Sequence, residues 1–239
     1  MLPQNYIVPA HLQHLVECSV EDHDALEDIT YPVITEFLLL HKQPSHRFTL
    51  YSQMALRWTP NQVMDIRSEV PDVGLVNFRR NRAFIFRLGV ESKRMRRVMV
   101  NLPSTRKVEG DKEVRIALHS AYFQAEDQAK AAVRGDHAPQ QRPIDYLLFV
   151  GPYWTHVTVG PFTEAQLTVR THKVSDSGDF WETLQATKRL EADPPSRKLF
   201  LLGTVESAIK MEEVITSTDG YGEAAMREAI THPPWGERQ

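Results

Sequence analysis

Two short apolar runs separated by a polar break constrain this chain more than any other feature. The first run covers 73–78, the second covers 83–90, and the break between them reads Arg-Arg-Asn-Arg. This pattern predicts a β-hairpin. A two-residue turn in the centre of the break pairs residues whose numbers sum to 163, which places Asp72 opposite Glu91. The turn lacks the glycine that such turns prefer, so the register is open to a shift.

Helices and further strands surround this hairpin in a definite order. One or two helices are expected between a capping signal at Ser19 and Lys42, with Pro32 marking a restart or kink. The other expected elements are strands within 46–58, a polar connector over 102–110, a helix from about 114 that closes at Gly135, strands over 146–150 and 153–159, and helices over 180–190 and after Gly203. The resulting order of helix, three strands, helix and strand predicts an α/β protein.

The composition is that of a globular protein and excludes several other classes. Of the 239 residues, 41% are apolar and 25% are charged. No stretch reaches the roughly eighteen apolar residues that a membrane helix needs, and residues 1–10 lack the regions of a secretory signal. Cys18 is the single cysteine, which excludes an internal disulfide and a thiolate zinc cluster. We therefore expect one domain over 1–239, intracellular and either cytoplasmic or nuclear, with no membrane partner.

Charge is distributed unevenly along the chain. The segment 79–97 carries eight basic residues and one acid, a charge of +7 within a chain of net charge −3. The segment 17–36 carries seven acids and no Lys or Arg. A concentrated basic stretch is typical of a surface that meets nucleic acid. The same stretch is also compatible with a solvated hairpin tip, and the acidic stretch with a solvated helix face.

The predicted hairpin brings three chemically useful side chains together. Glu91 and Lys93 are two residues apart in one strand and share a face, and Asp72 lies opposite Glu91 in the other strand. Facing carboxylates are unfavourable unless a cation lies between them, and oxygen ligands suit Mg²⁺ or Mn²⁺. Lys93 is then in place to orient or deprotonate a water, or to stabilise charge on a phosphate. The alternative without a function is that Glu91 and Lys93 form a surface ion pair at a strand end.

These residues give the chain a resemblance to a known family. Pro71-Asp72 on one strand and Glu91-Ser92-Lys93 on the next resemble the signature of the PD-(D/E)xK nuclease superfamily. The resemblance implies a restriction-endonuclease-like core of helix, three strands, helix and strand over about 26–160, with a C-terminal helical extension over about 161–230. The Gly-Pro-Tyr-Trp stretch at 151–154 is similar to basidiomycete fungal proteins of this type.

The resemblance also implies further site residues. The first helix of the family often carries an acid that completes the metal site, and Glu36 matches it best, with Glu27 and Asp28 as substitutes. The second core helix often carries a polar residue near the site, for which Gln124 and Gln128 are candidates because they lie one helical turn apart. Phosphate contacts are expected from three arginines near the catalytic lysine, which are Arg94, Arg96 and Arg97.

The expected function is therefore a metal-dependent nuclease that hydrolyses phosphodiester bonds in DNA or RNA. One alternative is a catalytically inactive module of the same fold that binds nucleic acid or a protein partner. A second is an interaction module that uses the acidic stretch 17–36. The chain has no GxxxxGK[ST], GxGxxG, GxSxG or HExxH motif, so nucleotide hydrolysis, dinucleotide redox chemistry and the hydrolase reactions that these motifs indicate lack support. No motif chooses between DNA and RNA or sets an oligomeric state.

Overall fold

A computed structural model of the chain describes residues 9–21, 30–42, 48–58, 67–78, 84–94, 107–168 and 199–220. Its elements in chain order are α1 (Ala10–Glu21), α2 (Thr30–His41), β1 (Thr49–Ser52), β2 (Leu56–Trp58), β3 (Arg67–Glu69), β4 (Val73–Phe78), β5 (Phe84–Lys93), α4 (Lys107–Arg134), β6 (Ile144–Val150), β7 (Tyr153–Val159), α5 (Glu164–Thr168), β8 (Phe200–Leu201) and α7 (Val205–Gly220). The chain is thus a mixed α/β protein, as the sequence predicted.

Six of the strands form one mostly antiparallel sheet in the order β1-β4-β5-β6-β7-β8. The exception is the pair of β5 and β6, which run parallel because the long helix α4 carries the chain back across the sheet between them. Strands β2 and β3 form a separate antiparallel pair. The predicted succession of helix, three strands, helix and strand is present as α2, β1, β4, β5, α4 and β6, with β2 and β3 inserted after β1.

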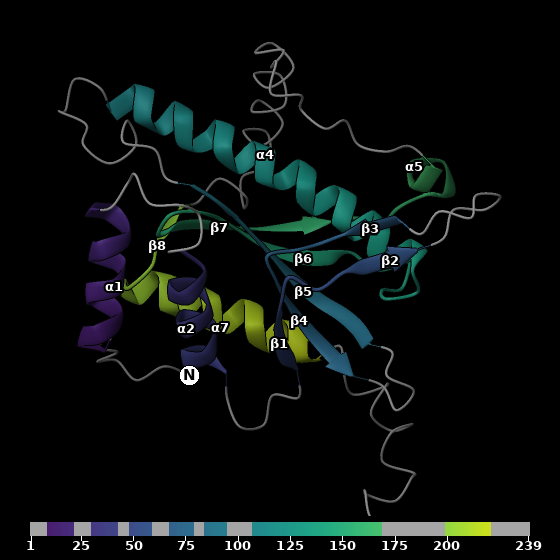
Figure 1. Ribbon diagram of the computed structural model, residues 1–239, viewed down its shortest axis with the longest axis horizontal. Coiled ribbons are helices and arrows are strands. Elements are labelled where there is room, and N and C mark those ends of the chain that lie inside the picture. The colour runs from purple at the N-terminus through teal and green to yellow at the C-terminus, as the bar shows by residue number, and fades with distance from the viewer. Residues whose placement is uncertain are drawn as a thin grey trace, which may run out of the picture.

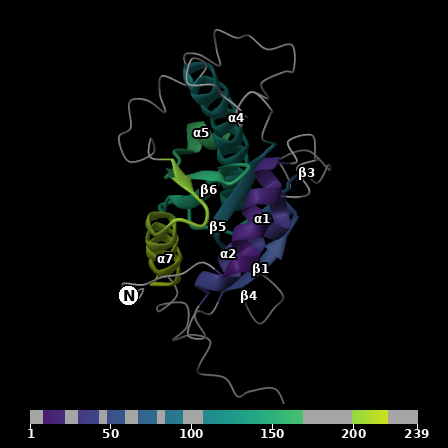
Figure 2. The same cartoon turned by 90° about the vertical axis from the view of Figure 1, so that its left-hand side faces the viewer.

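Helices cover both faces of the sheet (Figures 1 and 2). Helix α4 lies on one face, and α1, α2 and α7 lie on the other. Strand β6 lies between the two layers and is apolar on both sides: Tyr146 and Leu148 pack toward α4, whereas Leu147 and Phe149 pack toward the other three helices. Because side chains alternate along a strand, the two faces can be followed from this strand to its neighbours.

The hairpin of β4 and β5 has the predicted register at its end next to Asp72 and Glu91. Val73 pairs with Val90 and Leu75 with Leu88, and the numbers of each pair sum to 163. Beyond Leu75 the register shifts by one residue, because Arg87 is an extra residue in β5 and forms a β-bulge. The predicted turn at 81–82 lies outside the described residues. The bulge leaves the pairing next to Asp72 and Glu91 as expected.

Two helix boundaries differ from the expectation. Ser19 was expected to cap a helix but lies inside α1, which begins at Ala10. Helix α4 starts at Lys107, so it includes Gly110, which was expected in a polar connector. A glycine costs about 1 kcal/mol inside a helix, which a helix of 28 residues can absorb. Pro32 lies in the first turn of α2, where its missing N–H costs no helical hydrogen bond.

The C-terminal part shares the core instead of forming a helical extension beside it. Besides α5 and α7 it contributes the strand β8, which pairs with β7 at the sheet edge. The Trp154 indole N–H on β7 donates a hydrogen bond of 2.8 Å to the Ser207 hydroxyl on α7. Met211, Val214 and Ile215 of α7 pack in the same apolar cluster as α2. The helix predicted over 180–190 lies outside the described residues.

Candidate functional site

Asp72 is fixed at the point where β4 begins. Pro71 before it cannot donate a ladder hydrogen bond, a restriction typical of the first residues of a strand. The Asp72 carboxylate accepts hydrogen bonds from the Tyr31 hydroxyl, at 3.0 Å, and from the backbone N–H of Ser92, at 2.7 Å. Asp72 is therefore held both by the strand next to it and by helix α2.

Glu91 lies near the end of β5 and is almost completely buried, with 3% of its surface exposed. The Gln128 side-chain amide of α4 donates a hydrogen bond to Glu91 Oε1, and the same nitrogen donates to the Val70 carbonyl at 3.3 Å. Lys93 Nζ lies 3.9 Å from Glu91 Oε2, which confirms that the two side chains share a face. Lys93 itself is 19% exposed. Glu91 thus lies at the buried side of the cluster, and Lys93 lies at the side that faces solvent.

Burial raises the pKa of the Glu91 carboxyl from an ordinary 4.5 to about 8, and the negative charge of Asp72 adds to the increase. Hydrogen bonds from Gln128 and the Asp72 backbone and the positive charge of Lys93 oppose the change without cancelling it. The Glu91 carboxyl is therefore protonated in the metal-free protein near neutral pH, and its ionised form needs more positive charge than Lys93 supplies.

Tyr146 of β6 lies beside this cluster and is completely buried. A Cβ atom at Gly89 would lie 2.1 Å from the Tyr146 ring, so the glycine is what allows the ring to approach β5. Burial and the charge of Glu91 raise the pKa of the Tyr146 hydroxyl well above its ordinary value. Within the described part of the chain, the Tyr146 hydroxyl and Gln128 Oε1 are buried without a hydrogen-bond partner.

The structure brings some of the predicted residues together and leaves others apart. Asp72, Glu91, Lys93 and Gln128 form one cluster. Gln124 is exposed on α4. Arg94 is exposed directly after Lys93. Four candidates lie outside the described residues, namely Glu27, Asp28, Arg96 and Arg97.

Helix α2 reaches the site through its first turn and not through Glu36. Glu36 is exposed, and among the described residues no hydrogen bond or ion pair joins it to the cluster. Tyr31 bonds to Asp72, and the Thr30 hydroxyl lies 3.1 Å from the Ser92 hydroxyl. Glu36 lies five positions after Tyr31, which is roughly 140° around the helix axis. The two side chains therefore leave the helix in different directions.

Sequence reasoning missed Tyr31 and Tyr146. Tyr31 had no local signal, because its contact with Asp72 joins positions 41 residues apart. Tyr146 had a local signal, because it is the one tyrosine on the otherwise apolar α4 face of its strand. Gly89, inside the neighbouring strand, also indicates that a side chain approaches closely there.

The donor set fits a hard divalent cation. Within the described residues there is no group of three or more His, Cys, Asp or Glu side chains that could hold a metal ion. Mg²⁺ needs only one or two carboxylates, because water and substrate phosphates complete its shell. Asp72 and Glu91 supply these carboxylates, and the unpartnered Gln128 Oε1 is a further oxygen beside them. A cation here would supply the positive charge that Glu91 lacks.

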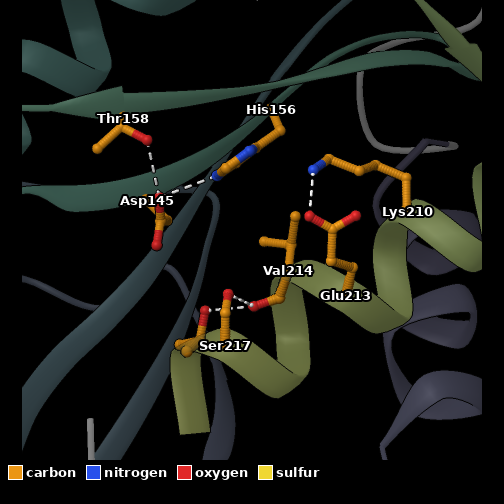
Figure 3. A network of polar contacts seen from close by, with 8 residues as sticks. Asp145, His156, Thr158, Lys210, Glu213, Val214 and Ser217 are labelled. Atoms are coloured by element: carbon orange, nitrogen blue, oxygen red, sulfur yellow. Dashed lines mark hydrogen bonds and ion pairs between the residues drawn. The ribbon is translucent and has the colours of Figure 1, made fainter. Parts of the chain in front are cut away.

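A second polar cluster lies on the opposite face of the sheet, next to α7 (Figure 3). Asp145 Oδ1 accepts hydrogen bonds from His156 Nε2, at 2.9 Å, and from the Thr158 hydroxyl, at 3.0 Å. On α7 close by, Lys210 and Glu213 form an ion pair of 2.8 Å. Each acid in this region has its partner in the chain itself.

Comparisons with protein-family models, with curated proteins and with solved structures found no match. No helix among the described residues is long and apolar enough to cross a membrane.

Proposed function

We propose that this chain is a metal-dependent nuclease of PD-(D/E)xK type that hydrolyses phosphodiester bonds in DNA or RNA. The observation that carries the proposal is the convergence of Asp72, Glu91 and Lys93 at one end of the β4–β5 hairpin. The two carboxylates come from neighbouring strands, and the lysine follows Glu91 by two residues, as in the family's signature. The order of helices and strands from α2 to β6 supports the same family.

Each residue of the cluster has a distinct task in this reaction. Asp72 and Glu91 would hold Mg²⁺ or Mn²⁺, which supplies positive charge to the phosphodiester oxygens when bound. Lys93, whose ammonium group donates hydrogen bonds and has no lone pair, would orient the attacking water and stabilise negative charge on the phosphate. The water oxygen forms a bond to phosphorus as its proton passes to solvent, and the bond to one ester oxygen breaks as that oxygen takes up a proton from solvent, which leaves a phosphate monoester and a free hydroxyl. Gln128 holds Glu91 in place.

Nucleic acid would approach from the exposed side of Lys93. Arg94 lies directly beyond it and is exposed, and a guanidinium is a donor that suits phosphate oxygens. Arg96 and Arg97 follow in the sequence and would extend the same contact. Because such contacts release counterions from the nucleic acid, binding is expected to weaken as salt rises.

A second candidate function is a catalytically inactive module of the same fold that binds nucleic acid or a protein partner. Two observations favour it: Glu36 is exposed, and the raised pKa of Glu91 disfavours the ionised form that a metal requires near neutral pH. In that case the charged cluster is retained without turnover, and the basic residues carry the binding.

A cleavage assay separates the two functions. Labelled single- and double-stranded DNA and RNA are incubated with Mg²⁺ or Mn²⁺ and either the wild type or one of two variants, Asp72→Asn and Lys93→Ala. Both variants are expected to lose cleavage by about 1,000-fold or more, since a metal site supplies several kcal/mol to the transition state. Asp145→Asn and Lys210→Ala make the same chemical changes on the opposite face and are expected to cleave like the wild type.

Two other outcomes would count against the nuclease. Cleavage by Asp72→Asn at the wild-type rate contradicts the proposed site. Salt-sensitive binding without cleavage, measured by fluorescence anisotropy and weakened by Arg94→Ala, supports the inactive module.

A further inference from the structure

Two buried polar atoms beside Glu91 lack a hydrogen-bond partner within the described part of the chain. They are the hydroxyl of Tyr146 and Oε1 of Gln128. Native proteins contain few such atoms, because burying a polar group without a partner costs stability. That both lie at one cluster suggests a common reason.

Packing alone does not explain the Tyr146 hydroxyl. The ring fills the space above Gly89 and lies 6.0 Å from the ring of Phe86, centre to centre. A phenylalanine would make the same ring contacts and would bury no hydroxyl. The side chain therefore carries one polar atom more than the core requires.

The register places this hydroxyl's residue next to Glu91. Tyr146 pairs with Gly89 in the parallel strands β5 and β6, and Glu91 follows Gly89 by two residues on the same face. The charge of Glu91 acts on the Tyr146 hydroxyl, so the two groups are electrostatic neighbours. Neutral tyrosine is a hydrogen-bond donor, and an ionised carboxylate has lone pairs left over after it binds a cation.

We propose that Tyr146 is a positioning residue for Glu91, whose hydroxyl donates a hydrogen bond to the Glu91 carboxylate once a divalent cation occupies the site. This inference rests on the proposed function, because it needs Glu91 to be a metal ligand. Partners that orient metal ligands commonly contribute 10–100-fold to metal affinity. The Tyr146 hydroxyl, which has no hydrogen-bond partner in the metal-free protein, would then donate a hydrogen bond to Glu91 in the metal-bound protein.

The test measures Mn²⁺ binding by calorimetry and thermal unfolding without metal, for the wild type, Tyr146→Phe and the control Tyr122→Phe. Tyr122 lies on α4 and packs against the same apolar cluster. We expect Tyr146→Phe to unfold at the same or a higher temperature than the wild type, and to bind Mn²⁺ at least about 10-fold more weakly. Tyr122→Phe is expected to bind Mn²⁺ like the wild type.

Two results would overturn the inference, and they differ from each other. Wild-type affinity in Tyr146→Phe shows that the hydroxyl has no role in holding Glu91, while the metal site itself stands. Absence of Mn²⁺ binding by the wild type removes the metal site and the inference together.

A spectroscopic measurement covers the case in which Tyr146→Phe does not fold. A tyrosine hydroxyl that begins to donate to a carboxylate shifts its ultraviolet absorption to longer wavelength. Addition of Mg²⁺ to the wild type is expected to produce this shift, and Tyr122→Phe, which alters a tyrosine outside the site, is expected to retain it. A wild-type spectrum unchanged by Mg²⁺ at saturation, or a shift lost in Tyr122→Phe, contradicts the assignment to Tyr146.

Discussion

The two polar clusters on opposite faces of the sheet are built in different ways. Asp145 is partly exposed, at 15%, and one of its carboxylate oxygens accepts hydrogen bonds from both His156 and Thr158. Glu91 is almost fully buried, lies near a second carboxylate and has a lysine 3.9 Å away. The first cluster is complete within the chain, whereas the second is short of positive charge and has hydrogen-bond capacity to spare.

This contrast is the one expected between a structural acid and, under the proposed function, an acid that binds a metal. A polar group with a purely structural role is expected to have its partners in the folded chain. Groups that break this rule concentrate at sites that act on something outside the chain. The cluster at Glu91 breaks it twice, in charge and in unused hydrogen-bonding atoms.

The largest predicted effect in the metal-free protein concerns Glu91 and pH. The folded-state pKa of Glu91 is raised from 4.5 to about 8, so its contribution to stability is fully present below 4.5 and is lost as pH rises through about 8. Glu91→Gln removes the ionisation, and we expect this variant to gain up to a few kcal/mol over the wild type between about pH 5 and pH 9. Urea unfolding at several pH values measures the difference.

Mn²⁺ provides the control for this prediction. A bound cation stabilises the ionised form of Glu91, so saturating Mn²⁺ should shrink the advantage of Glu91→Gln at high pH. A difference between the two proteins that stays constant from about pH 5 to pH 9 would show that Glu91 does not titrate as described.

A smaller effect is expected from Gly89→Ala, which perturbs the wall of the same cluster. The new Cβ would lie 2.1 Å from the Tyr146 ring, and the ring has no free space to enter because it is completely buried. Overpacking of this kind costs typically about 1–3 kcal/mol in the free energy of unfolding, measured with urea. Gly74→Ala is the matched control, since its Cβ would lie 2.9 Å from a single Phe86 ring atom. An equal loss in both variants would contradict the tighter approach at Gly89.

The smallest effect on stability is expected from a change in the cluster around Asp145. Thr158→Val removes one of the two donors to Asp145 and leaves His156 in place. The residue is exposed, so water can replace the lost bond, and the free energy of unfolding should fall by about 1 kcal/mol or less. Mn²⁺ binding should not change. A change in Mn²⁺ affinity would mean that the two faces of the sheet are coupled.

Much of the fold followed from local patterns in the sequence. The hairpin register at Asp72 and Glu91 depends on two adjacent strands and on the alternation of their side chains. The bulge at Arg87 was missed, because it arises where the strands continue toward the turn and no glycine or proline marks it. Helix α1 was also missed; over residues 10–18, the part of the helix whose burial is described, Leu12 alone is buried, so this part carries a weak apolar stripe.

The site was predictable where it depended on one hairpin and not where it depended on how helices dock. Asp72, Glu91 and Lys93 come from neighbouring strands. Gln124 and Gln128 share a helix face, yet Gln128 alone lies against Glu91, and that choice depends on how far along the sheet α4 is placed. The exposure of Glu36 follows from the rotation of α2 about its axis, which the apolar pattern of a helix buried on several sides does not fix.

The position of β8 has a consequence for how the protein is made. Strand β8 covers the outer edge of β7 at Tyr153 and Trp154, and α7 follows it to pack beside α2. A nascent chain that has reached β7 on the ribosome therefore presents a free strand edge and an uncovered tryptophan until residues 200–220 emerge. Completion of the core is thus postponed until residues 200–220 have been made, and the earlier elements must avoid pairing with other chains until then.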